Sequence, residues 1–174
     1  MRLEPLVLYH PSKNGGMAVQ FEFRIPVEYD DAGRAQKDSV KQGGCFITWA
    51  QQVPGSGTGG DARFDWKDGW TVKLGLSDLS TWLVSRERYR LRGMDVVSSK
   101  TPGLWERLHR SDSGGQTPTT VVIRYEFNAD GGGSLGLSYS KEERRSLRLS
   151  DDEEYLVNRY LSMVTDSFLM VGKR

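Results

Sequence analysis

The segment Met17-Ala18-Val19-Gln20-Phe21-Glu22-Phe23-Arg24-Ile25 decides the fold class of this 174-residue chain. Large apolar residues occupy its odd-numbered positions, and small or polar residues occupy its even-numbered positions. A period of two places successive side chains on opposite faces of a β-strand. We therefore expect a half-buried strand, with one face against the core and the other towards water.

More strand patterns follow this segment. The Gly-rich stretch 54–60 predicts a flexible hairpin connection, and Asp68-Gly69 between two tryptophans predicts a tight turn. The expected strands cover residues 45–52, 62–67 and 70–76. After them Ser77 or Asp78 can cap a helix that reaches about Leu91, because apolar residues then recur at helical spacing.

The second half of the chain repeats this order of elements. Its expected strands cover residues 104–110, 119–127, 134–140 and 146–149. Ser150 followed by Glu153 is a capping-box signature, so a last helix is expected to begin there and to carry a broad apolar stripe. The sequence predicts one α+β domain over residues 1–174, in which residues 14–91 and 103–171 share a plan of four strands and a helix.

The overall charge does not identify a function. The chain has 24 Lys and Arg against 23 Asp and Glu, a net charge of +1, so any basic surface must come from segregation of charge. The single cysteine, Cys45, cannot form an internal disulfide, which favours a reducing compartment. The sequence shows no convincing signal peptide and no apolar run near the roughly 20 residues of a membrane helix, so we expect a cytoplasmic protein, associated with a nucleoid or found in a phage-infected cell.

Motifs for catalysis are weak. His10, His109 and Cys45 are too few for a zinc cluster or a Cys-His couple. Residues 55–60 match the bare G-x-G-x-x-G pattern, but a strand rather than a helix is expected to follow them, so dinucleotide binding is disfavoured. The acidic run 151–154 fits a helix start better than a metal site. We expect no enzyme, no cofactor and no metal.

Binding chemistry fits the sequence better. Proteins that bind single-stranded nucleic acid combine cations that follow the phosphates with aromatic rings on which bases stack. Lys13 precedes the first strand beside Asn14-Gly15-Gly16, where a cation and backbone amides could meet a phosphate. Trp49 lies among polar residues in the strand 45–52. For both residues the alternative stays open: a solvated lysine in a turn, and a tryptophan of the core.

Further candidates come from the later strands. Arg63 and Lys67 share a face with Asp65, opposite Phe64 and Trp66, and we expect that face to contact the ligand, with Lys73 extending it. In the second half, a face opposite Leu104 and Leu108 combines a ring with basic groups, and a charged hairpin follows. These candidates are Trp105, Arg107 and His109, then Lys141, Arg144 and Arg148.

The whole chain resembles the Whirly, PC4 and PUR superfamily of single-stranded nucleic-acid-binding proteins. The similarity rests on the order of elements, on residues 12–19 (Ser-Lys-Asn-Gly-Gly-Met-Ala-Val) and on residues 64–75, which run into Asp78-Leu79. The opening segment is similar to the lysine, glycine and small-residue motif of Whirly proteins, with Asn14 and Gly15 interrupting it. The resemblance implies two antiparallel four-stranded sheets packed with two helices.

The resemblance also implies a partner and an assembly. Members bind single-stranded DNA or, in one branch, guide RNA, and their protomers associate through the helices into dimers or tetramers. The apolar stripe of the last helix supplies the expected interface residues, which are Leu156, Tyr160, Val164 and Phe168. We expect binding of single-stranded DNA with little sequence preference; RNA annealing and a non-binding oligomeric scaffold stay open as alternatives.

Overall fold

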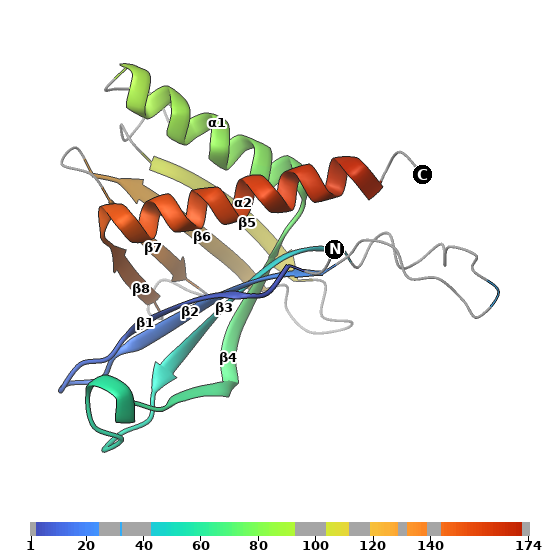
Figure 1. Ribbon diagram of the computed structural model, residues 1–174. Helices are drawn as coiled ribbons and strands as arrows, with labels where there is room; N and C mark the ends of the chain where they lie inside the picture. The colour runs from blue at the N-terminus through green and yellow to red at the C-terminus, as the bar shows by residue number, and fades with distance from the viewer. Residues whose placement is uncertain are drawn as a thin grey trace.

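The computed structural model describes residues 3–24, 32, 43–92, 104–111, 119–128, 132–138 and 144–171. Two groups of four strands, each followed by a helix, make up the chain (Figure 1). The first group is β1 Leu6–His10, β2 Met17–Arg24, β3 Gly44–Gln52 and β4 Phe64–Leu74, followed by α1 Leu76–Arg92; a short 3-10 helix, Gly59–Asp61, precedes β4. The second group is β5 Leu104–Ser111, β6 Thr119–Phe127, β7 Gly133–Ser138 and β8 Arg144–Leu149, followed by α2 Asp151–Val171.

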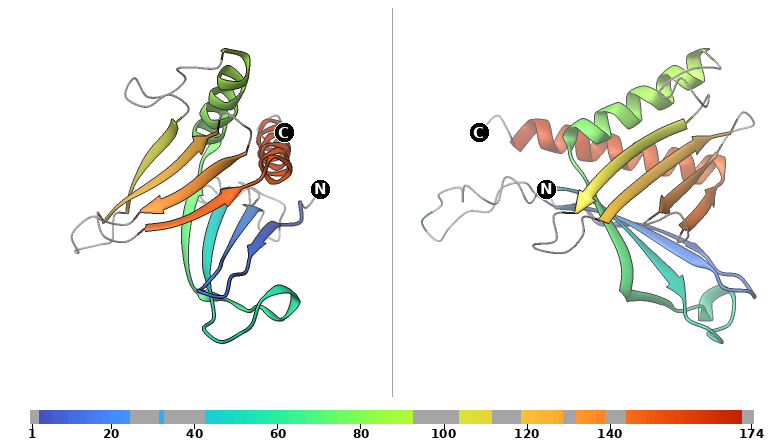
Figure 2. Two further views of the ribbon diagram at one scale, coloured as in Figure 1. Left: turned by 90° about the vertical axis from the view of Figure 1, so that its left-hand side faces the viewer. Right: turned by 180° about the vertical axis from the view of Figure 1, so that it is seen from behind.

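Each group of strands forms its own antiparallel sheet. The orders are β1-β2-β3-β4 and β5-β6-β7-β8, so every strand pairs with its neighbour along the chain. The two sheets lie at an angle to each other, and both helices cover one face of the β5–β8 sheet (Figure 2). This is the duplicated α+β plan expected from the sequence, and the predicted fold class is confirmed.

A single core fills the space between the sheets and the helices. Trp82 of α1 is fully buried; its ring centroid lies 4.7 Å from that of Trp105 and 4.8 Å from that of Tyr125. Its indole nitrogen donates a 3.1 Å hydrogen bond to Oδ1 of Asn158 in α2. Because a buried indole N–H needs an acceptor, this bond fixes α1 against α2.

The helix that follows β8 begins as the sequence predicts. The backbone nitrogen of Ser150 donates a 2.9 Å hydrogen bond to Glu153 Oε2, and the nitrogen of Glu153 donates one of 3.3 Å to Ser150 Oγ. This reciprocal pair satisfies two backbone donors that a helix start leaves open. Neither helix, over the residues that the structure describes, is long and apolar enough to cross a bilayer.

Two details of the first sheet differ from the sequence-based expectation. Residues 6–10 form an edge strand, so the first repeat begins before the expected residue 14. The strands expected at 62–67 and 70–76 are one strand, and Asp68-Gly69 is not a hairpin turn. Trp49 pairs with Trp70 while Gln51 pairs with Asp65, so the residues between Asp65 and Trp70 bulge out of the ladder.

Candidate nucleic-acid interface

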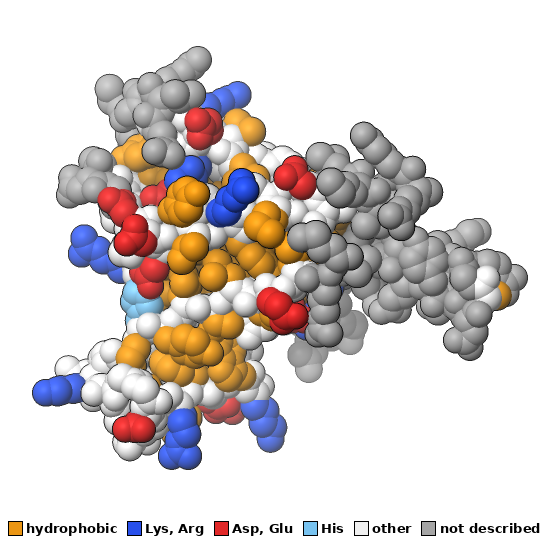
Figure 3. Space-filling model, viewed as in Figure 1, with side chains coloured by type: hydrophobic (Ala, Val, Ile, Leu, Met, Phe, Trp, Pro, Cys, Tyr) orange, Lys and Arg blue, Asp and Glu red, His pale blue; other side chains and the backbone are white. Residues whose placement is uncertain are grey.

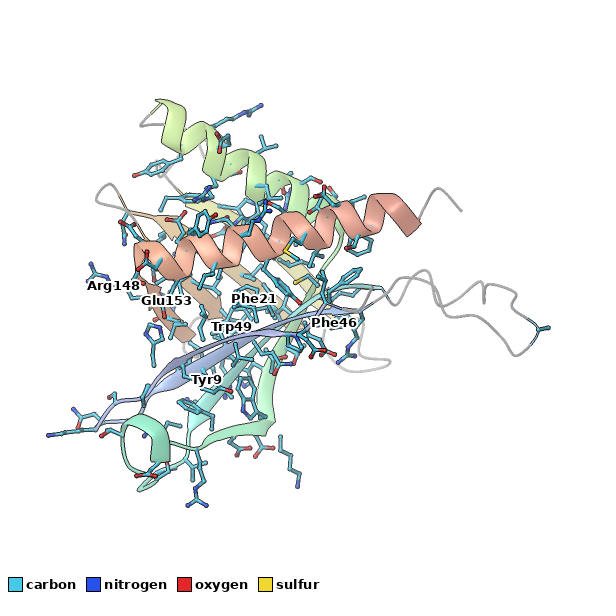
Figure 4. All side chains as sticks on the ribbon, in the orientation of Figure 1. Tyr9, Phe21, Phe46, Trp49, Arg148 and Glu153 are labelled. Atoms are coloured by element: carbon cyan, nitrogen blue, oxygen red, sulfur yellow. The ribbon has the colours of Figure 1, made fainter. Side chains whose placement is uncertain are left out.

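One face of the β1–β4 sheet points away from α2, and we call it the outer face. Cross-strand pairs share a face, so the register defines it. One row of pairs runs Val7, Gln20, Thr48 and Thr71, and another runs Glu22, Phe46 and Lys73. The alternate rows contain Phe21 and Trp49, which are fully buried. Figure 4 shows Tyr9 and Phe21 on opposite sides of the sheet, with Phe21 on the side of α2.

Three rings cover one end of the outer face. The Tyr9 ring centroid lies 5.5 Å from that of Phe64 and 6.5 Å from that of Trp66. Small residues, Ala18 and Ala50, occupy the adjacent positions of β2 and β3, and both are fully buried although they belong to the outer face. The rings lie over this pair of alanines, and Tyr9 remains 56 % exposed.

A fourth ring occupies the other end of the outer face. Phe46 is partly exposed, and the guanidinium carbon of Arg24 lies 4.3 Å from its ring centroid. Lys73 Nζ lies 6.0 Å from the same centroid. Glu22 accepts a 3.1 Å hydrogen bond from Arg24 at the edge of this group. Two cations therefore lie near the Phe46 ring, and Arg24 also contacts an acidic side chain.

Neutral polar side chains lie between the two groups of rings. Thr48 and Thr71 are cross-strand partners whose hydroxyl oxygens lie 2.9 Å apart, and Gln20 completes their row. Figure 3 shows a patch of hydrophobic side chains in the lower half of the molecule, below α2, with Lys and Arg side chains at its lower border. The outer face thus combines exposed rings, hydrogen-bonding groups and cations, which is the chemistry that binds an unpaired polynucleotide.

The expected role of Trp49 as a stacking ring is wrong. Its side chain has no exposed surface, and its backbone carbonyl accepts a 3.0 Å hydrogen bond from Nη1 of Arg145. Period-two alternation correctly separates Trp49 from its neighbours in β3. The aromatic residue of β3 that reaches the outer face is Phe46, three positions before Trp49.

Trp105 belongs to the inside of the molecule, whereas the Arg107 side chain is 36 % exposed. Trp105 is fully buried against Trp82, and its Nε1 donates a 3.3 Å hydrogen bond to Thr81 Oγ1 in α1. Arg107 Nη2 donates a 2.8 Å bond to the same oxygen, and its Nε lies 3.3 Å from Asp78 Oδ1. These contacts attach β5 to the start of α1. The prediction that Trp105 contacts a ligand is wrong, because its ring is buried against α1; the expected ligand contact of Arg107 stays a prediction.

The other predicted cations have different environments. Lys13, Arg63, Lys67, Arg144 and Arg148 are exposed, and within the described part of the chain no protein group pairs with their side chains. Arg63 and Lys67 do not join the rings, since Phe64 and Trp66 occupy the outer face. The side chain of His109 and the whole of Lys141 lie outside the described residues.

The face of the β5–β8 sheet that points away from the helices has a simpler composition. Arg144 pairs with Ser138 across the strands, and Arg148 pairs with Ser134. Arg124 makes a 2.7 Å ion pair with Glu106. Among the described residues of this face there is no aromatic ring, so it offers cations without a stacking surface.

Only some of the residues expected at the helix interface are exposed on the protomer. Val164 is fully buried and Tyr160 is 8 % exposed, with its hydroxyl accepting a 3.0 Å hydrogen bond from the nitrogen of Phe23. Both belong to the core of the protomer, so their expected role in an interface is wrong. Phe168 is partly exposed and its ring centroid lies 5.3 Å from that of Phe23, whereas Leu156 is 48 % exposed.

Buried ionisable groups give no sign of catalytic chemistry. Burial, with a smaller contribution from Glu22, raises the pKa of the Cys45 thiol to about 12, so this cysteine stays protonated and unreactive. Across the described ranges no three His, Cys, Asp or Glu side chains gather as a metal site.

Comparison with solved structures identifies the fold. The structure of the plant transcriptional regulator PBF-2 superimposes with a TM-score of 0.61 over 99 % of this chain and 94 % of that chain, at 15 % sequence identity. The fold is Whirly-like. Neither a family model nor a curated protein matches the sequence. The neighbour is a regulator rather than an enzyme, and at this identity the likeness establishes the Whirly-like architecture alone.

Four residues of the interface were not selected from the sequence. The sequence pattern does not single out Tyr9, because β1 is short and follows a moderately apolar terminus. It does not single out Phe46, because Trp49 in the same strand carries the larger ring. Phe64 and Trp66 were assigned to the face opposite the ligand. The alternation in residues 45–52 and 62–67 could have suggested Phe46, Phe64 and Trp66, had the side of the sheet that contacts the helices been known.

Proposed function

We propose that this protein binds single-stranded DNA on the outer face of its β1–β4 sheet, with little sequence preference. The observation that carries the proposal is the placement of Tyr9, Phe46, Phe64 and Trp66 on one sheet face that no described element covers, beside the cations Arg24 and Lys73. Each base stacked on such a ring contributes about 1 to 3 kcal/mol, whatever its identity. Such binding would protect or organise exposed strands in replication, repair or transcription.

The spacing of the rings sets the scale of the ligand. Tyr9 is the cross-strand partner of Ala18 in β2, and Phe46 is the cross-strand partner of Glu22. Ala18 and Glu22 are four residues apart along β2. Four residues of a strand cover roughly 13 Å. Only a strand of several nucleotides reaches both ends, so very short oligonucleotides are expected to bind weakly.

The proposal includes a non-catalytic role and self-association. Val84 and Tyr155, which are 48 % and 61 % exposed, line a groove of about 430 Å³ between α1 and α2, and Leu156, 48 % exposed, follows Tyr155 in α2. Exposed apolar side chains gathered at one site favour contact with another protein surface. We place the contact between protomers there, on the side of the molecule remote from the rings.

Fluorescence anisotropy with labelled probes tests the binding proposal. The expected order is strong binding of a 20-residue oligo-dT and weak binding of the matched duplex, because a duplex hides the base faces. Comparing the affinity for oligo-dT with the affinity for a matched RNA strand shows whether the protein prefers DNA or RNA, since only RNA has a 2′-hydroxyl. Equal affinity for single strand and duplex, or no binding of either, would contradict the proposal.

A further inference from the structure

Two hairpin tips form a cleft at the end of the β1–β4 sheet, and we call it the loop cleft. Residues 12–15 line one side and residues 52–55, 57 and 58 line the other, around a space of about 690 Å³. The first tip joins β1 to β2, and the second joins β3 to β4. The space is large enough for part of a nucleotide.

Gln52 holds the two tips in place. Its side chain is 9 % exposed, and its Oε1 accepts hydrogen bonds of 2.9 Å from the nitrogen of Ser12 and 2.8 Å from the nitrogen of Gly16. Its Nε2 donates a 2.5 Å bond to the carbonyl oxygen of Gly57 in the opposite tip. One buried amide therefore fixes the width of the cleft before any ligand arrives.

A glycine is required beside this amide. A Cβ atom at position 16 would lie 2.4 Å from Gln52 Oε1 and 2.2 Å from the carbonyl oxygen of His10. In the opposite tip Gly55 and Gly57 have φ angles of +73° and +79°, a backbone region that other residues rarely adopt. The Gly-rich sequence is thus explained by the shape of the cleft.

The lining of the cleft favours an anion. It contains Lys13 and no carboxylate. The backbone N–H groups of Lys13, Gly55, Gly57 and Thr58 donate to no protein acceptor in the described chain. A cation together with several unused amide donors is the combination that proteins use for phosphate.

The loop cleft is continuous with the group formed by the Tyr9, Phe64 and Trp66 rings, which we call the ring cluster. Gln52 is the cross-strand partner of Phe64, and the ring of Phe64 lies 5.5 Å from that of Tyr9. A strand stacked on these rings therefore has its next phosphate within reach of the cleft. We propose that the loop cleft binds a phosphate group of the nucleic acid, from an internal linkage or from a strand end; this inference rests on the proposed function.

Anisotropy titrations of Lys13→Gln test this site. The probes are a linear 12-residue oligo-dT with hydroxyl ends, the same strand with a 5′- or a 3′-phosphate, and a circular oligo-dT. We expect the substitution to weaken binding about 10-fold or more, because it removes one hydrogen bond to a charged group. A loss on every probe indicates an internal phosphate, and a loss confined to one phosphorylated end indicates a terminal one. Arg88→Gln, which removes an exposed cation of α1 outside both the cleft and the proposed protomer contact, is the matched control and should bind every probe like the wild type.

Amide chemical shifts give a second readout that does not depend on affinity. Adding the phosphorylated oligonucleotide should move the backbone resonances of Lys13, Gly55 and Gly57 in the wild-type protein. Unchanged affinity of Lys13→Gln for all probes, together with unmoved loop resonances, would overturn the phosphate site. If Tyr9→Ala weakens binding in that same experiment, the proposed function stands without the cleft; if wild-type protein binds no probe, the proposed function itself fails.

Discussion

The guanidinium carbon of Arg145 in β8 lies 3.9 Å from the centroid of the Trp70 ring in β4. The Nη1 atom of Arg145 also bonds the carbonyl oxygen of Trp49 in β3. Arg145 belongs to the second repeat and both tryptophans belong to the first. A mostly buried cation therefore joins the two sheets behind the outer face.

Replacing Arg145 should destabilise the whole fold. Arg145→Met loses the cation–ring contact and leaves the Trp49 carbonyl without this donor, so we expect the free energy of unfolding to fall by about 2 to 3 kcal/mol. Urea denaturation followed by circular dichroism measures the change. Arg148→Met, on the exposed face of the same strand, is the matched control and should change it by less than about 0.5 kcal/mol. Equal effects of both substitutions would contradict the role of Arg145 in joining the two sheets.

Tryptophan fluorescence should locate the ligand. Trp66 lies in the ring cluster, whereas Trp49, Trp82 and Trp105 are fully buried. Stacked bases quench only a ring that they touch, so Trp66→Phe should lose most of the quenching that oligo-dT causes. Trp105→Phe should keep it, although its core is disturbed. Full quenching in Trp66→Phe would show that the strand binds elsewhere.

The salt dependence of the affinity for single-stranded DNA should show whether the cations beside Phe46 contact phosphates. The logarithm of affinity for a single strand falls with the logarithm of salt concentration by about 0.7 for each phosphate neutralised. Lys73→Gln should therefore make this slope shallower by about 0.7. Arg124→Gln is the control, because Arg124 lies on the β5–β8 sheet, away from the outer face. A slope that Lys73→Gln leaves unchanged would exclude contact of Lys73 with phosphate.

Acid should weaken the start of α2 through Glu153. Burial alone raises the pKa of this carboxyl, but the hydrogen bonds from Ser150 and the contact with His10, at 2.7 Å, outweigh it and hold the pKa below its usual value. A lowered pKa in the folded state stabilises the protein above the unfolded pKa, and this stability is lost as pH falls through the folded pKa.

The test compares unfolding free energies between pH 6 and pH 3. Glu153→Gln should lose about 1 kcal/mol at pH 6, and its difference from the wild type should shrink as pH falls. Asp152→Asn, an exposed first-turn carboxylate, should show a smaller difference. A difference for Glu153→Gln that stays constant with pH would refute this assignment.

Self-association should depend on the exposed part of the helix surface. Tyr155→Glu places a charge in the groove between α1 and α2 and should shift the protein towards the monomer in sedimentation velocity, without changing its circular dichroism. Glu87→Gln lies at the same groove and serves as the control. A wild type that is already monomeric at high concentration would contradict the proposed contact.

Local signals in the sequence predicted the elements well. Ser150 and Glu153 define the start of α2 because both lie within one helical turn, and the alternation around Phe21 defines β2 because a period of two is a property of the strand itself. The bulge after Asp65 could not be predicted in this way, because local signals do not show which residues pair across strands. Asp68-Gly69 has the local signature of a turn, and only the pairing of Trp49 with Trp70 shows that the strand continues.

The candidate site was harder to predict than the fold. Alternation separates Phe46 from Trp49, and Leu108 from Trp105, but it does not say which member of each pair faces the core. The packing of the helices decides that choice, leaving Leu108 61 % exposed and Trp105 buried. Lys13 is recognisable locally as a cation beside glycines, whereas Gln52, which accepts hydrogen bonds from the nitrogens of Ser12 and Gly16, lies in another hairpin.

The affinity of the double variant Tyr9→Ala/Phe46→Ala for a 20-residue oligo-dT tests the central claim most directly. Both rings are at the surface and at opposite ends of the outer face, so their removal should leave the fold intact, as circular dichroism can verify. We predict a loss of affinity of about 30-fold or more, since each stack contributes about 1 to 3 kcal/mol. An affinity equal to that of the wild type, with the fold preserved, would contradict binding on this face.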